Sequence, residues 1–160
     1  MQNLSRAAGE DGATGGTVYG LLVHSLLAHA PFDALPHDLE GLAAAEARLL
    51  GLDEQTASRA ARAVERAFAH DVVRRARAAA ERGQCRRESP ISWTLADNTT
   101  IEGVVDLAFE EAARWHVVDF KTDRELDAEG EERYRRQVSI YAAAIARATN
   151  APVDAMLIRL

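Results

Sequence analysis

The spacing of apolar residues changes after Gly83, and this change restricts the fold more than any other feature of the chain. Before it, apolar residues recur every three or four positions, which is the period of an amphipathic helix. After it, apolar and polar residues alternate as in half-buried strands, until a second helical stretch and a final apolar run. The order is therefore helices, three strands, a helix and a strand, which predicts one α/β domain.

Helices are predicted over most of the first half and again near the C-terminus. The run VYGLLVHSLLAHA is apolar almost all round, so we expect a buried helix near 17–30 that ends before Pro31. Gly51 is expected to end the second helix, and Asp53 to cap the third. The other predicted helices span 38–50, 53–69, 70–82 and 128–149.

The strands are predicted from alternation between turn sequences. Short links join the first three strands, so these are expected to be antiparallel neighbours, with Ala112 and Ala113 at the tip of the second hairpin. The last strand follows the long helix. The predicted strands span 88–95, 100–111, 114–123 and 153–160.

Two acidic residues stand inside apolar strand sequences, Asp106 in VVDLAF and Asp119 in HVVDFKT. With the hairpin tip at 112–113, they lie directly opposite each other. Like charges in this arrangement destabilise a strand pair, so the pair is expected to need a cation. Carboxylate oxygens suit Mg²⁺ or Mn²⁺. The pair alone also fits a surface hairpin whose acids are simply solvated, and this interpretation stays open.

Lys121 is the only lysine in the chain, because the other eighteen basic residues are arginine. In a strand it shares a face with Asp119, two residues earlier. An ammonium group is a compact point charge, whereas a guanidinium group is a planar fork. A lysine retained against this compositional bias indicates a site where the shape and pKa of the cation matter, beside a water or a phosphate oxygen.

Composition limits the class of protein. Hydrophobic residues make up 48% of the chain and charged residues 28%, which is typical of a globular domain; we expect it to span 17–160, behind a flexible lead-in at 1–16. No uncharged apolar run is long enough to cross a membrane, and no secretory signal core is present, so a cytoplasmic location is expected. A single cysteine, Cys85, excludes an internal disulfide and a cluster held by four cysteines.

The charge is unevenly distributed. The net charge is −6, yet residues 58–87 contain nine arginines and three acids. Such a run is commonly a solvated helix face, and it would also suit contact with nucleic acid.

Five segments together resemble a known nuclease pattern. GVVD at 103–106, DFKT at 119–122 and QVSIY at 137–141 are similar to the D…DxK…QxxxY pattern of the PD-(D/E)XK nuclease superfamily. YGLLVH at 19–24 and RESP at 87–90 resemble further elements of the RecB/AddA-type nuclease domain, found at the C-terminus of bacterial helicase–nucleases. The resemblance covers nearly the whole chain. It implies a restriction-endonuclease-like core, with a central mixed sheet of three antiparallel strands, a further strand after a helix, and an N-terminal helical region.

The resemblance also implies a reaction and the residues that perform it. The reaction is metal-assisted hydrolysis of DNA phosphodiesters, with Mg²⁺ as the expected metal and Mn²⁺ as an alternative. Lys121 would position the attacking water, while Gln137 and Tyr141 would organise the site and the DNA strand. The implied metal ligands are His24, Asp106, Asp119 and the backbone carbonyl of Phe120.

Each of these roles has a simpler alternative. His24 could be a buried histidine bonded to a backbone carbonyl, Tyr141 could serve mainly in packing, and Gln137 could be a surface amide. Glu88 could supply an extra carboxylate to the metal.

The resemblance also implies partners. No iron–sulfur cluster can form with one cysteine, and no phosphate-binding loop of an ATP-driven motor occurs. The resemblance to RecB/AddA-type domains implies a helicase domain, in the same longer chain or in a partner subunit, that delivers single-stranded DNA ends to an exonuclease. The alternatives are a stand-alone exonuclease and a non-catalytic module on the same fold.

Overall fold

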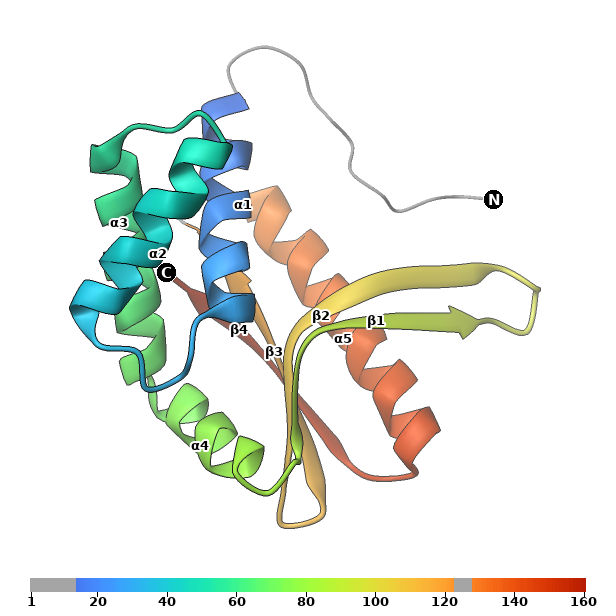
Figure 1. The fold of residues 1–160 in the computed structure, drawn as a ribbon. Helices are drawn as coiled ribbons and strands as arrows, with labels where there is room; N and C mark the ends of the chain where they lie inside the picture. Colours follow the sequence, from blue (N-terminus) through green and yellow to red (C-terminus); the bar gives the residue numbers. More distant parts are fainter. Residues whose placement is uncertain (1–13, 123–127) are drawn as a thin grey trace.

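The structure, a computed structural model, describes residues 14–122 and 128–160 (Figure 1). Within these residues the order of elements is four helices, three strands, a helix and a strand, as predicted. The helices are α1 (Thr14–His29), α2 (Pro36–Leu49), α3 (Glu54–Ala69), α4 (Asp71–Ala80) and α5 (Ala128–Thr149). The strands are β1 (Cys85–Thr94), β2 (Thr100–Glu111), β3 (Arg114–Lys121) and β4 (Val153–Arg159).

The predicted boundaries differ from the observed ones by up to three residues, and the largest differences lie at the starts of α1 and β1. Helix α1 begins at Thr14, inside the predicted lead-in, and residues 1–13 of that lead-in lie outside the described part of the chain. Strand β1 begins at Cys85 rather than at residue 88. Strand β3 ends at Lys121, and residue 123 of the predicted span is not described. The expected boundary signals are present, since the Asp53 side chain accepts the N–H of Thr56 and Gly51 has a positive φ of 69°.

The four strands form one mixed sheet in the order β1-β2-β3-β4. The first three are antiparallel, and β4 runs parallel to β3 because the chain returns through α5. Helices α1–α4 pack on one face of the sheet and α5 packs on the other (Figure 1). The predicted α/β class and sheet are therefore confirmed, and none of the described helices could span a membrane.

The β2–β3 hairpin has the predicted tip and register. Ala112 and Ala113 both have positive φ, at 52° and 59°, which is the condition for the tight turn whose twist matches antiparallel strands. Glu111 pairs with Arg114, and the ladder continues to Leu107 opposite Val118.

Strands β1 and β2 bend sharply before their common hairpin leaves the body of the domain (Figure 1). In a regular strand, residues two apart share a face. Here Leu107 packs in the core beneath α1–α4, whereas Val105 packs in the core beneath α5. The side chains of β2 therefore change faces at Asp106, and those of β1 change faces at Glu88. Neither residue is among the paired residues of the β1–β2 ladder, and Glu88 has a positive φ of 49°.

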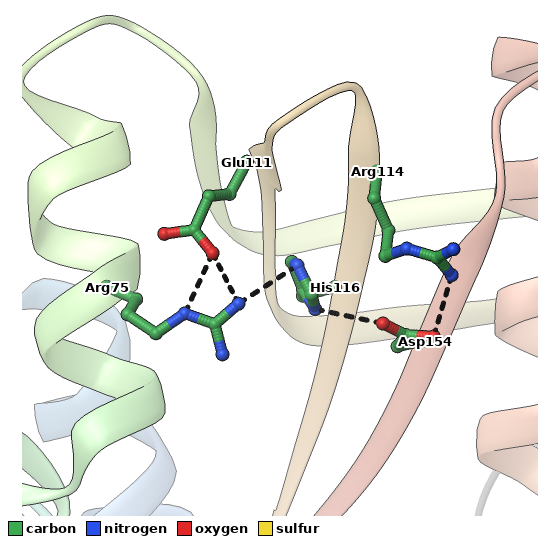
Figure 2. A network of polar contacts seen from close by, with 5 residues as sticks. All are labelled: Arg75, Glu111, Arg114, His116 and Asp154. Carbon is green, nitrogen blue, oxygen red and sulfur yellow. Dashed lines mark hydrogen bonds and ion pairs between the residues drawn. The ribbon is translucent and has the colours of Figure 1, made fainter.

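A polar network ties the β2–β3 hairpin to the elements on either side of it (Figure 2). Arg75 of α4 forms an ion pair with Glu111, and its guanidinium lies 3.2 Å from Nε2 of the buried His116. Asp154 of β4 contacts both Arg114, at 3.0 Å, and His116 Nδ1, at 3.6 Å. Burial, followed by the charge of Arg75, holds the pKa of His116 below its usual range. The network therefore joins α4, the hairpin and β4.

Gly103 of β2 allows a close contact with α5, and this contact gives a prediction. A Cβ atom at residue 103 would overlap the Tyr141 ring, which is 5% exposed and hydrogen-bonded to Gln137. We expect Gly103→Ala to lower the free energy of unfolding by about 1–3 kcal/mol, because the buried ring has to move. Chemical denaturation measures the change.

A glycine in open space is the matched control. A Cβ at Gly41 of α2 would have no atom within 4 Å. Gly41→Ala should raise stability by about 0.5–1 kcal/mol, because it removes the entropy cost of a helical glycine. Equal effects of the two substitutions would show that α5 does not press on β2 as described.

Candidate metal centre and active site

Asp106 stands at the bend of β2 and joins three elements. Its Oδ2 accepts the backbone N–H of Phe120 in β3 at 2.8 Å. Its Oδ1 lies 3.2 Å from His24 Nδ1 in α1. These contacts hold the carboxylate in one orientation between the helical layer and the sheet. Because it is only partly buried, it remains open to a further ligand.

Glu88 joins Asp106 and His24 in a cluster. One ligand atom from each residue lies within 4.8 Å of the others, so the three could hold one ion. Their imidazole and carboxylate groups suit a divalent cation. Burial, followed by the charge of Asp106, raises the pKa of Glu88, and the two histidines His24 and His29 oppose the shift. Two carboxylates this close together, with Glu88 exposed and Asp106 partly buried, therefore favour a cation.

Arg87 fixes helix α1 against β1 beside this cluster. Its guanidinium donates to the carbonyls of Leu27 and Ala30, at 3.0 and 2.6 Å, and lies 4.3 Å from the ring centroid of Phe32. Burial lowers the pKa of Arg87, although a cation at the C-terminal end of a helix meets the negative end of its dipole. Because Arg87 precedes Glu88, these bonds also place Glu88 relative to α1.

Asp119 and Lys121 form a buried ion pair next to Asp106. Their side chains project from the same face of β3, and Lys121 Nζ lies 3.0 Å from Asp119 Oδ2. The two residues are 3% and 7% exposed, so both charges have lost most of their water. Burial, followed by repulsion from Asp106, raises the pKa of Asp119 to about 6, against the opposing effect of Lys121.

The environment of the Asp119 carboxylate suits a divalent cation. Its Oδ2 is buried and, within residues 14–122 and 128–160, has no hydrogen-bond partner beyond the ion pair with Lys121. A nearby cation would supply the missing interaction. Among the described residues, however, the compact group of ligands comprises His24, Glu88 and Asp106 and does not include Asp119.

Gln137 and Tyr141 lie together on α5, as their spacing predicts. Gln137 Nε2 donates to the Tyr141 hydroxyl at 2.5 Å. The ring of Tyr141 is buried against Val105 and Val117 and covers Gly103. Tyr141 therefore has a packing role, and its hydroxyl also orients Gln137.

The structure brings two further residues to the site. Glu88, expected as an extra carboxylate for the metal, belongs to the compact cluster. The pairs on either side of it, Arg87 with Leu107 and Ser89 with Val105, bring it level with Asp106. Tyr134 of α5 is not among the predicted site residues. Its ring lies over the ammonium of Lys121, with Nζ 4.3 Å from the ring centroid. The three-residue spacing from Gln137 is its sequence signal. For Phe120, the structure shows a backbone N–H bound to Asp106 and a side chain in the core.

The raised pKa of Asp119 makes the stability of the metal-free protein depend on pH. The folded protein binds this proton with a pKa of about 6, whereas the unfolded chain binds it with a value near 3.9. The contribution of Asp119 to the free energy of unfolding is therefore fully present below about pH 4 and is lost as the pH rises through 6. The loss attributable to Asp119 is up to about 3 kcal/mol. Denaturation in EDTA across this range should show a fall that Asp119→Asn abolishes; an unchanged slope in the variant would contradict the assignment.

Divalent cations should reverse this loss. Bound Mn²⁺ favours the ionised carboxylates, so the increase in melting temperature caused by Mn²⁺ should be larger above pH 6 than at pH 5. His24→Ala and Glu88→Gln should each reduce the increase, because each removes a ligand atom. Asp97→Asn, in the exposed β1–β2 turn, is the control and should leave the increase unchanged. An equal increase in all variants would place the ion elsewhere.

The comparisons with known proteins agree with the fold. The chain matches the PD-(D/E)XK nuclease superfamily over residues 2–160. None of the curated proteins matches it. The four-stranded mixed sheet with helices on both faces is consistent with the restriction-endonuclease-like fold of that superfamily. Because the match spans nearly the entire sequence, the chain belongs to the PD-(D/E)XK nuclease superfamily.

Proposed function

We propose that this protein is a metal-dependent deoxyribonuclease that hydrolyses phosphodiester bonds. The observation that carries the proposal is the position of the His24–Glu88–Asp106 cluster next to the buried pair of Asp119 and Lys121. A structural ion pair needs no further carboxylates beside it, because each added negative charge raises the cost of the others. A cluster of this kind suits a cation and a phosphate instead.

His24, Glu88, Asp106 and Asp119 would hold the metal, which is Mg²⁺ or Mn²⁺ under this proposal. A divalent cation supplies Lewis-acid activation of water and neutralises charge that develops on the phosphate. The remaining steps belong to the chain itself, and the compact ammonium of Lys121 is held at the site by Asp119.

Lys121 stabilises the negative charge of the phosphate and orients the attacking water through its N–H groups. Asp119, with a pKa near 6, is ionised in most molecules at neutral pH and accepts a hydrogen bond from that water. Gln137 is held by the Tyr141 hydroxyl. Under this proposal its amide group helps to position the strand.

The finer assignment is to the RecB/AddA-type nuclease domains. The order of the GVVD, DFKT and QVSIY segments supports it, together with His24 on the first helix and Glu88 on the strand before Asp106. Under this assignment the protein is an exonuclease that acts on single-stranded DNA ends. A helicase, in a longer chain or a partner subunit, delivers the strand in the cytoplasm. A protein with a net charge of −6 repels DNA at long range, which agrees with a strand that a helicase delivers rather than one that the protein captures from solution.

Degradation of end-labelled single-stranded DNA tests the proposal. The wild-type protein should cleave with Mg²⁺ or Mn²⁺ and not with EDTA. Asp119→Ala and Lys121→Arg should each reduce the rate by about 10²–10⁴-fold, because one removes a carboxylate of the site and the other replaces a point charge with a planar fork.

Asp154→Asn is the matched control, because this carboxylate also lies on the sheet but contacts Arg114 and His116 rather than the cluster. It should cleave at the wild-type rate. Cleavage in EDTA, or full activity in Asp119→Ala, would refute the proposal. A folded protein that cleaves nothing and takes up no Mn²⁺ would instead identify a non-catalytic module.

A further inference from the structure

Three arginines lie close together on the N-terminal half of α5, and one of them differs from the others. Arg135 forms an ion pair with Glu131 at 2.7 Å, and Arg136 forms one with Glu132 at 2.9 Å. Arg133 has no carboxylate partner within the part of the chain that the structure describes. It is exposed, so its charge is available to a ligand from solution.

Arg133 rests on an aromatic ring that also contacts Lys121. Its guanidinium carbon lies 5.1 Å from the ring centroid of Tyr134, and one of its nitrogens lies 3.5 Å from the tyrosine hydroxyl. The ammonium of Lys121 lies 4.3 Å from the same centroid. Contacts of this geometry are attractive, because the face of an aromatic ring is negative. The ring of Tyr134 therefore holds two cations at a set separation.

The two cations differ in how their charges are compensated. Lys121 is buried and paired with Asp119, whereas Arg133 is exposed and makes no ion pair with a described residue. Two like charges on one ring repel each other unless an anion is near. Arg133 also precedes Gln137 by four residues, so both lie along one face of α5. Gln137 is partly buried and Arg133 is exposed, so Arg133 lies at the solvent side of this face.

We propose that Arg133 binds a phosphate of the nucleic-acid strand, adjacent to the phosphate that lies beside Lys121. Tyr134 is the positioning residue that sets the distance between the two cations. The ligand is the sugar–phosphate backbone, so the contact carries no base specificity. This inference rests on the proposed nuclease function and adds a substrate contact to the same site.

Binding of a dye-labelled single-stranded oligonucleotide, followed by fluorescence anisotropy in EDTA over a series of salt concentrations, tests this contact without cleavage. Arg133→Ala should weaken binding several-fold and reduce the slope of log K against log salt by about 0.7, as expected for one lost phosphate contact on a single strand. Arg136→Ala is the matched control on the same helix, because Arg136 is held by Glu132. It should keep the wild-type slope.

Cleavage kinetics separate the role of Arg133 in binding a phosphate from the role of Tyr134 in positioning Lys121. Arg133→Ala should raise KM more than it lowers kcat, because Arg133 contacts a neighbouring phosphate rather than the reacting one. Tyr134→Ala should lower kcat as well, because Lys121 loses the ring that covers it, and Tyr134→Phe should recover most of that loss because the ring is retained. The Mn²⁺-induced increase in melting temperature should stay the same in all of these variants, which shows that the metal cluster is intact.

The outcomes distinguish failure of this inference from failure of the proposed function. If the wild-type protein cleaves DNA but Arg133→Ala and Arg136→Ala have equal salt slopes and equal KM, Arg133 is not a phosphate contact and the inference is refuted. The nuclease assignment then stands. If the wild-type protein neither binds nor cleaves DNA, the proposed function is refuted and the inference fails with it.

Discussion

The hydrogen bond from the Phe120 N–H to the carboxylate of Asp106 connects the parts of the candidate site. Asp106 stands where β1 and β2 exchange faces, and its other oxygen meets His24 of α1. The bend turns Glu88 of the neighbouring strand toward the same point, at a positive φ that a non-glycine residue adopts only where surrounding contacts enforce it. Helix α1, the bent hairpin and β3 therefore meet at one carboxylate.

Burial of charge distinguishes this meeting point from an ordinary structural contact. A buried ion pair contributes little net stability, because desolvation offsets most of the attraction between its members. Asp119 has a raised pKa even with Lys121 beside it, so the folded protein stores unfavourable charge there. A divalent cation relieves that cost, and the relief couples metal binding to folding. The cost of burying charge also explains why residue 121 is a lysine. Its compact ammonium fits between the carboxylate oxygen of Asp119 and the aromatic ring of Tyr134.

Helix α5 packs on the face of the sheet opposite to α1–α4 and contacts the site from that side. Tyr141 packs on Gly103 and bonds to Gln137, and Tyr134 lies over Lys121 one or two turns earlier. One face of a single helix thus contacts both β2 and β3. A shift of α5 along its axis would move the amide of Gln137 and the ring over Lys121 together, so the packing of Tyr141 on a glycine also sets the geometry around the lysine.

Local patterns in the sequence were sufficient for the order of elements, the tip of the β2–β3 hairpin and its register from Glu111 to Leu107, because each depends on residues close together in the chain. Composition singled out Lys121, and the family resemblance pointed to His24, Gln137 and Tyr141. The membership of Glu88 in the cluster, the separation of Asp119 from it and the ring over Lys121 were decided only in the tertiary structure. These features depend on where two strands bend and how α5 lies on the sheet, which are set by packing between distant segments rather than by the periodicity of any one of them.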